Sequence, residues 1–232
     1  SAAAYKDPSD WVRDTKTNVL GAINVAKAAL ECGVKKVINF QTALCYGRPN
    51  FVPIKESSAV APFTSYGISK TAGEQFLINS GLNVISFRLA NICGPRLAIG
   101  PIPTFYQRLK DGKSCFCSDT IRDFLDMSDF LNLIETAIDT NIPTGIYNIS
   151  TGVGSSIKDV FDEVVAHLGL PAQEVPIVPV GDDDVPAVVL DPTETEKTFG
   201  WEAKIPFEEI IQRQLKWYDA HGVSAIFSHF NA

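Results

Sequence analysis

The chain has 232 residues, of which 45% are hydrophobic and 20% charged, a composition typical of a globular protein with one large domain or two small ones. A net charge of −7 argues against a nucleic-acid or anionic-membrane partner. No apolar run approaches the roughly 20 residues of a membrane span. We therefore expect no nucleic-acid partner and no membrane partner.

The cysteines are odd in number and form no paired framework, which predicts free thiols in a reducing compartment, the cytoplasm. Cys115 and Cys117 could suggest a metal ligand pair. The three histidines lie far away in the sequence, however, and no C-x-x-C partner exists. We predict no metal site. The five cysteines are Cys32, Cys45, Cys93, Cys115 and Cys117.

Helices and strands alternate along the first half of the chain. Apolar residues at helical spacing predict a helix over 16–32 that ends at Gly33, and a second helix over 66–79. Apolar runs at 35–40 and 83–90 predict buried strands. This alternation has the spacing of βαβ crossovers and predicts a parallel sheet with helices on its faces.

The second half mixes loops with further elements. We expect a short helix within 100–113, a strand and helix over 122–139 with Ser128 as N-cap, and a strand over 145–152. The run "STGVGSSI" (150–157) lacks the third glycine of a dinucleotide fingerprint, so we interpret it as a turn before a helix. The last predicted elements are a helix over 156–169 capped by Ser155 or Ser156, and a helix over 206–222.

Three polar residues are predicted to meet at one edge of this sheet. Thr42 follows one strand, Asn91 follows the other, and Tyr66 opens the helix between them. Ligands on parallel sheets bind beyond the carboxyl ends of the strands. Tyr66 and Lys70 are four residues apart and share a helix face, where an ammonium favours the phenolate that a general base requires. The alternative is a solvated Tyr/Lys face.

Seven motifs occur along the chain in a fixed order. They are "SAAAY", "TNVLGAINVAKAA", "NFQTALCYG", "TSYGISK", "RLANICGPR", "RDFLDMSD" and "LDPTETEKTFGW". With these motifs the chain resembles the extended short-chain dehydrogenase/reductases, specifically the NAD-dependent epimerase/dehydratase family, and is most similar in character to bacterial UDP-sugar epimerases of lipopolysaccharide O-antigen biosynthesis.

The resemblance implies a fold and a division of the chain. The fold would be α/β, a Rossmann-like doubly wound parallel sheet with a smaller α+β substrate domain. Residues 1–96 would form the C-terminal part of the NAD-binding Rossmann domain. Residues 97–232 would mainly bind the nucleotide sugar, with the segment of about 123–150 returning to the Rossmann sheet.

The resemblance also assigns catalytic roles. Tyr66 would take a proton from a sugar hydroxyl, and Lys70 would hold the nicotinamide ribose. Thr42 would hydrogen-bond the reacting oxygen, or alternatively cap its own backbone. Asn18 would contact the cofactor, although a buried structural hydrogen bond is an equal alternative. Ala3 and Ala4 would line the cofactor site as the end of a Rossmann strand.

For the substrate, the resemblance points to three residues. Arg122 would pair with the diphosphate of a nucleotide sugar, the alternative being a surface ion pair with Asp123 or Asp126. Asn91 would donate to a phosphate oxygen. Phe116 would stack on the base, or else belong to the core.

The implied reaction is NAD-dependent epimerisation of a UDP-sugar at C4 through a transient keto intermediate. Dehydratases of the family carry acidic residues after the catalytic Thr, whereas residues 43–45 here are Ala, Leu and Cys. The alternatives are an NAD(P)-dependent keto-sugar reductase, a dehydratase, and a non-catalytic dinucleotide-binding sensor. The helices at 16–32 and 66–80 would pair with those of a second copy to form a homodimer, or would only cover the sheet.

The chain departs from the family in two places. Val180 stands where the family usually has an arginine that contacts the nucleotide. The sequence begins at what resembles the fourth strand, so the glycine-rich pyrophosphate loop is absent from it. We expect a fragment of a longer polypeptide, or an unrecorded segment, and little or no activity from the 232 residues alone.

Overall fold

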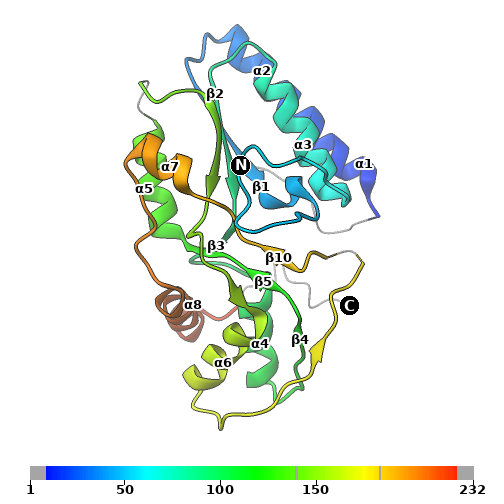
Figure 1. Cartoon of the computed structure of the whole chain (residues 1–232), viewed down its shortest axis with the longest axis vertical. Helices are drawn as coiled ribbons and strands as arrows, with labels where there is room; N and C mark the ends of the chain where they lie inside the picture. The colour runs from blue at the N-terminus through cyan, green and yellow to red at the C-terminus, as the bar shows by residue number, and fades with distance from the viewer. Residues whose placement is uncertain (1–8, 139–140, 183, 224–232) are drawn as a thin grey trace.

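A parallel three-stranded sheet forms the centre of the upper part of the molecule (Figure 1). In this computed structural model, residues 9–138, 141–182 and 184–223 are described. The strand order is β1-β2-β7, with both neighbouring pairs parallel. The predicted parallel α/β sheet is confirmed, and the segment that follows residue 123 returns to it through β7. The strands are β1 (Val37–Thr42), β2 (Val84–Leu89) and β7 (Gly145–Ile149).

Helices cover both faces of this sheet (Figure 1). On one face Leu77 belongs to the same apolar cluster as Val84 of β2. On the other face the rings of Phe87 and Phe199 lie 5.7 Å apart. Burial on both faces is what a doubly wound sheet requires. The helices are α2 (Gly21–Glu31) and α3 (Ser65–Ile78) on the first face, and α5 (Met127–Ala137) and α7 (Thr193–Phe199) on the second.

Helices and short strands form the lower part of the molecule (Figure 1). Their apolar residues build a separate cluster, which we call the helical core, in which the rings of Phe105 and Phe161 lie 5.3 Å apart. The helices are α4 (Pro101–Lys110), α6 (Ile157–His167) and α8 (Phe207–His221). The strands are β3 (Asn91–Cys93), β4 (Cys117–Ser118), β5 (Ile121–Arg122), β6 (Phe124–Asp126), β8 (Ser155–Ser156), β9 (Ile177–Val178) and β10 (Ala187–Val188).

Several predicted boundaries need correction. The segment before α2 is a short helix α1 (Trp11–Asp14) followed by a π-helical turn η1 (Thr15–Leu20). The N-cap of α5 is Asp126 and not Ser128: its carboxylate accepts the backbone N–H of Ser128 at 2.7 Å. Both residue types favour this position, and the extended backbone of Asp126 decides between them.

Two predicted helix ends are confirmed. Gly33 follows α2 with a φ of +63°, a conformation that glycine adopts without strain. Ser156 caps α6 in a capping box with Asp159. The "STGVGSSI" run is therefore the turn and cap of a helix, as expected.

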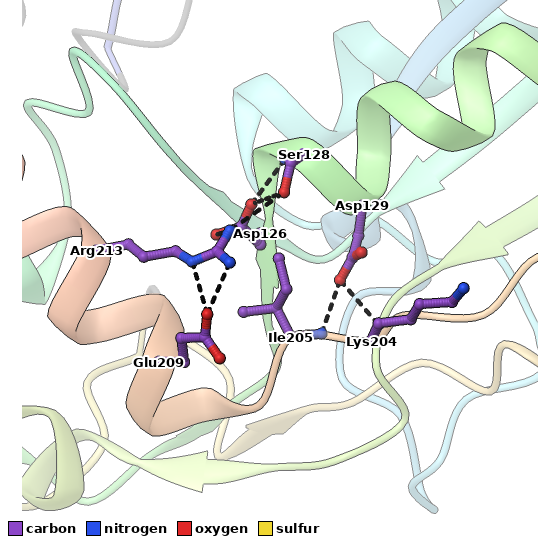
Figure 2. A network of polar contacts seen from close by, with 7 residues as sticks. All are labelled: Asp126, Ser128, Asp129, Lys204, Ile205, Glu209 and Arg213. Atoms are coloured by element: carbon purple, nitrogen blue, oxygen red, sulfur yellow. Dashed lines mark hydrogen bonds and ion pairs between the residues drawn. The ribbon is translucent and has the colours of Figure 1, made fainter.

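A polar latch fastens the start of α8 to the start of α5 (Figure 2). The buried carboxylate of Asp129 accepts the backbone N–H groups of Lys204 at 2.9 Å and Ile205 at 3.0 Å. Arg213 of α8 binds Glu209 at 2.7 Å and lies 3.7 Å from the Asp126 carboxylate. The last aspartate of "RDFLDMSD" thus joins the two parts of the molecule.

Candidate active site

The carboxyl edge of the parallel sheet gathers the predicted catalytic residues. Thr42 is the last residue of β1 and lies opposite Leu89 in the parallel register. Asn91 follows two residues beyond Leu89 and begins β3. The side chains of Thr42 and Asn91 therefore leave the same edge of the sheet, as the sequence predicted.

Helix α3 brings Tyr66 and Lys70 to this edge. Thr64 caps the helix by accepting the backbone N–H of Gly67 at 3.1 Å, which sets Tyr66 in the first turn. One turn later the ammonium of Lys70 donates to the carbonyl of Phe40 in β1 at 2.5 Å. Burial lowers the pKa of Lys70, and the nearby Glu74 carboxylate opposes that shift.

Thr42 caps a short 3₁₀ helix, η2 (Ala43–Tyr46), by accepting the N–H of Leu44 at 3.2 Å. The alternative role predicted for this hydroxyl is therefore realised, and its own proton remains available to donate. A Cβ added at Gly67 would lie 3.1 Å from the Leu44 carbonyl oxygen. Glycine at this position lets η2 and α3 approach closely, which brings Thr42 toward the start of the tyrosine helix.

A group of mostly buried polar side chains, which we call the polar layer, holds α3 against the sheet. Arg88 pairs with Glu74 at 2.9 Å, and both side chains are almost fully buried. Ser86 donates to the same carboxylate at 2.6 Å, and Asn39 donates to Ser86 at 2.9 Å. These directional bonds fix the position of α3 along β1 and β2.

Of the residues predicted only for the cofactor, the structure describes Asn18. Asn18 lies buried in η1 and donates to the hydroxyl of Ser69 at 2.9 Å, so the structural hydrogen bond that was its alternative is present. Ala3 and Ala4 lie outside the described residues.

The predicted substrate residues have specific partners. Arg122 binds the Asp184 carboxylate at 2.5 Å and the Val185 carbonyl at 2.8 Å. The ion pair with Asp123 or Asp126 that we weighed as its alternative was wrong, because residue 184 supplies the carboxylate. The amide of Asn91 donates to the Asp123 carbonyl at 3.1 Å.

Phe116 is 61% exposed and so does not belong to the core, which was its alternative. Its stacking role stays a prediction. Phe116 directly precedes β4, and β4 pairs with β9.

Sequence reasoning missed a buried acid close to Asn91. The Asp123 carboxylate accepts the Thr151 N–H at 3.0 Å, the Thr151 hydroxyl at 2.7 Å and the Gly152 N–H at 3.0 Å. Burial raises its pKa to about 6, although these three hydrogen bonds lower it. Only the motif "RDF" signalled this residue, without its bonding partners.

Two further residues, at the start of α3 and beside it, were also missed. The buried carboxylate of Asp14 accepts the hydroxyl of Ser65 at 2.6 Å. Asp14 lies four residues before Asn18, and Ser65 lies four residues before Ser69. This matched helical spacing is a signal that the sequence carried.

Two other features are absent from the residues that the structure describes. No group of three His, Cys, Asp or Glu side chains there could hold a metal ion. None of the helices in that part of the chain is long and apolar enough to cross a membrane.

This parallel sheet with helices on both faces and a polar carboxyl edge defines a Rossmann-type α/β protein. The model of the "NAD dependent epimerase/dehydratase family" matches residues 1–150. The chain belongs to that family.

Solved and curated relatives agree with this assignment. The Bordetella bronchiseptica enzyme WbmG in complex with NAD is 64% identical, with a TM-score of 0.94 over 99% of this chain and 73% of that chain. A complex of the same enzyme with NAD and UDP also matches, at 63% identity and a TM-score of 0.94 over 100% of this chain and 75% of that chain.

Two curated relatives are more distant and differ in their reactions. The "UDP-glucose 4-epimerase" of Halalkalibacterium halodurans is 27% identical over 94% of this chain and 72% of its own length. The "dTDP-D-glucose 4,6-dehydratase" of Mus musculus is 29% identical over 88% of this chain and 61% of its own length. The chain spans 55–59% of the length of several other curated relatives.

Proposed function

We propose that the protein is a cytoplasmic NAD-dependent nucleotide-sugar epimerase that inverts C4 of a UDP-sugar through a transient keto form. The observation that carries this proposal is the 2.5 Å contact of the Lys70 ammonium with the Phe40 carbonyl. It holds the ammonium beside the strand that ends at Thr42, one turn after Tyr66 in α3. The family and the NAD and UDP complexes of WbmG support it.

The side chains at this edge suit NAD. The Lys70 ammonium and the hydroxyls of Tyr66 and Thr42 are partners that ribose and sugar hydroxyls can hydrogen-bond. When bound, NAD accepts and returns a hydride. Lys70 would hold the cofactor ribose and favour the ionised form of Tyr66. Asn18, with Ala3 and Ala4, would complete the cofactor side.

The chain's own residues would move the proton. Tyr66 takes the proton of the C4 hydroxyl as general base, while Thr42 donates a hydrogen bond to the reacting oxygen. After the keto sugar rotates in the site, Tyr66 gives the proton back to the oxygen. One residue thus serves as base and then as acid, and no second acid is required.

Substrate binding would fall to the lower part of the molecule. Arg122 would meet the diphosphate, Asn91 would donate to a phosphate oxygen, and Phe116 would stack on the base. In this division residues 1–96 and about 123–150 carry the cofactor part, and the rest of 97–232 carries the nucleotide-sugar part.

Epimerisation is favoured over dehydration by the residues around Thr42. The turn η2 that follows Thr42 contains no carboxylate. Glu74, which lies on the same helix as Tyr66, is bound by Arg88 and Ser86. Elimination of water needs a proton donor for the leaving hydroxyl, and neither position offers a free one.

The test uses the full-length gene product. After denaturation, mass spectrometry identifies any nucleotide released; the proposal expects NAD. Incubation with UDP-glucose and other UDP-hexoses should then give a product of unchanged mass that separates by chromatography. Tyr66→Phe should lower kcat by about 10²- to 10⁴-fold. Tyr106→Phe, a tyrosine of the helical core, is the control for loss of one phenol.

The rival functions give different results in the same assay. A dehydratase yields a product lighter by one water, and a reductase consumes reduced cofactor in proportion to product. A sensor releases NAD on denaturation but turns over no sugar, with Tyr66→Phe indistinguishable from wild type. Any of these outcomes would replace the epimerase proposal.

We also propose that two copies associate through α2 and α3. Val25, Leu30 and Phe76 are exposed on these helices, at 55%, 50% and 52%. A cavity of about 560 Å³ with Ile23, Leu30 and Phe76 in its wall lies between the helices. Light scattering should give a dimer for the wild type and a monomer for Phe76→Glu. Ile138→Glu, an exposed residue after α5, should leave the mass unchanged.

A further inference from the structure

Helix α3 presents two different polar faces. Tyr66, Lys70 and Glu74 recur every four residues and so share one face of the helix. On the sheet side Lys70 donates to the Phe40 carbonyl and Glu74 binds Arg88. Ser65 and Ser69 form the second face. They meet the segment of α1 and η1, as their hydrogen bonds to Asp14 and Asn18 require.

The second face is fixed at three successive turns. Asp14 accepts the Ser65 hydroxyl at 2.6 Å, and Asn18 donates to the Ser69 hydroxyl at 2.9 Å. One turn further on, a Cβ added at Gly73 would lie 2.3 Å from the Asn18 carbonyl oxygen. Two hydrogen bonds and one backbone contact therefore set both the register and the rotation of α3.

Asp14 is an unusual member of this set because it is a buried carboxylate, 2% exposed. Among the described residues it takes part in no ion pair. Burying such a charge is costly unless something compensates it. The compensation here is a charge-assisted hydrogen bond from Ser65, in the first turn of α3, where the helix dipole is positive.

We propose that Asp14 is a positioning residue for the proposed reaction: through Ser65 it fixes the first turn of α3 and so aims the Tyr66 phenol at the reacting oxygen. Ser65 directly precedes Tyr66, so a rotation of the first turn displaces the phenol. The Thr64 cap alone restrains the end of the helix and not its rotation about its axis. This inference rests on the proposed function of Tyr66.

A misplacement of about 1 Å can cost about 10²-fold in rate without changing binding. Asp14→Leu and Ser65→Ala should therefore lower kcat by about 10- to 100-fold while KM for the UDP-sugar and the amount of retained NAD stay the same. The double variant should be no slower than the slower single variant, because both changes remove one interaction. Asp14→Asn keeps an acceptor of the same size and should recover most of kcat.

The matched control is Tyr106→Phe. It also removes a hydroxyl-to-carboxylate hydrogen bond, 2.7 Å long to Asp219, but lies in the helical core. It should lower the unfolding temperature as Ser65→Ala does and leave kcat unchanged. The proposal is overturned if Ser65→Ala loses no more kcat than this control, or if the Asp14 and Ser65 effects simply add.

A second measurement separates this inference from the proposed function. The ionisation of Tyr66 is followed by ultraviolet difference titration against Tyr66→Phe, which needs no turnover. If the wild type turns over no sugar, the proposed function fails, whereas the titration still tests the aim of the phenol. In Asp14→Leu the pKa of Tyr66 should move toward that of free tyrosine, because the phenol would lie farther from Lys70. An unchanged titration curve would refute the positioning role.

Discussion

Different interactions stabilise the two parts of the molecule. Between α3 and the sheet lies the polar layer, in which the buried Glu74, Ser86 and Arg88 and the half-buried Asn39 are joined by hydrogen bonds. The helical core of α4, α6 and α8 is built from apolar side chains that include Phe105, Phe161, Val160, Ile211 and Leu215. Apolar packing excludes water and tolerates small shifts, whereas directional bonds specify one placement. Directional hydrogen bonds are found in the part that contains the proposed catalytic helix.

Removing one charge from the polar layer should have the largest effect. Glu74→Gln keeps the shape but leaves the buried Arg88 guanidinium without its counter-charge. We expect the free energy of unfolding to fall by about 3–5 kcal/mol, measured by urea denaturation. The double variant Glu74→Leu with Arg88→Met should recover most of the loss. A cost below about 1 kcal/mol for Glu74→Gln would show that the layer is not specified by charge.

Asp123, which lies on the chain between β5 and β6, should make stability depend on pH. Its folded pKa of about 6 exceeds the ordinary value of 3.8, so the folded state binds more protons between these values. Its contribution to stability is present below about pH 4 and is lost as the pH rises through 6, a change of about 3 kcal/mol.

Urea denaturation at pH 4 and pH 7 measures this change. The comparison with Asp123→Asn isolates the carboxyl group from the other groups that titrate. An equal pH dependence in the two proteins would contradict the raised pKa.

The helical core should tolerate a change of shape at nearly constant volume. Leu215 is fully buried in this core. Leu215→Met should cost less than about 1.5 kcal/mol, because the flexible thioether refills the space. The same denaturation experiment measures it beside Glu74→Gln. A larger loss from Leu215→Met than from Glu74→Gln would reverse the contrast between the two parts.

The capping box of α6 should give the smallest effect. Ser156→Ala removes the oxygen that accepts the Asp159 N–H at 3.0 Å and should cost about 1 kcal/mol. Ser57→Ala, at an exposed turn, serves as the control and should be neutral. Thermal unfolding resolves the difference. An effect equal to the control would mean that packing alone orders this end of the helical core.

Periodicity and alternation were enough to predict most of the fold. The helices α3, α6 and α8 follow apolar spacing of about 3.6 residues, and the βαβ alternation predicted the parallel sheet. The short helices α1 and α7 were missed because one turn or two of helix carries little periodicity. The π-helical turn at 15–20 was also missed; its residue Asn18 is bonded to Ser69 of α3, a contact that is not local in sequence.

Only the residues of the candidate site that are related by regular spacing in the sequence could be predicted. Tyr66 and Lys70 followed from one helical turn, and Thr42 and Asn91 from two strand ends. The partner of Arg122 lies 62 residues away in Asp184, and the partner of Ser65 lies 51 residues away in Asp14. Such pairs depend on how elements pack, which no local pattern encodes. The roles of these residues in catalysis and binding stay predictions.

The latch of Figure 2 offers a way to follow motion in the molecule. Lys204 and Ile205 lie between α7 and α8, outside any helix or strand, where backbone amides usually exchange hydrogen for deuterium quickly. Both donate to the buried Asp129 carboxylate, so they can exchange only when α5 and the start of α8 separate. These two amides should therefore exchange slowly, and their exchange rate would report how often the two parts of the molecule come apart.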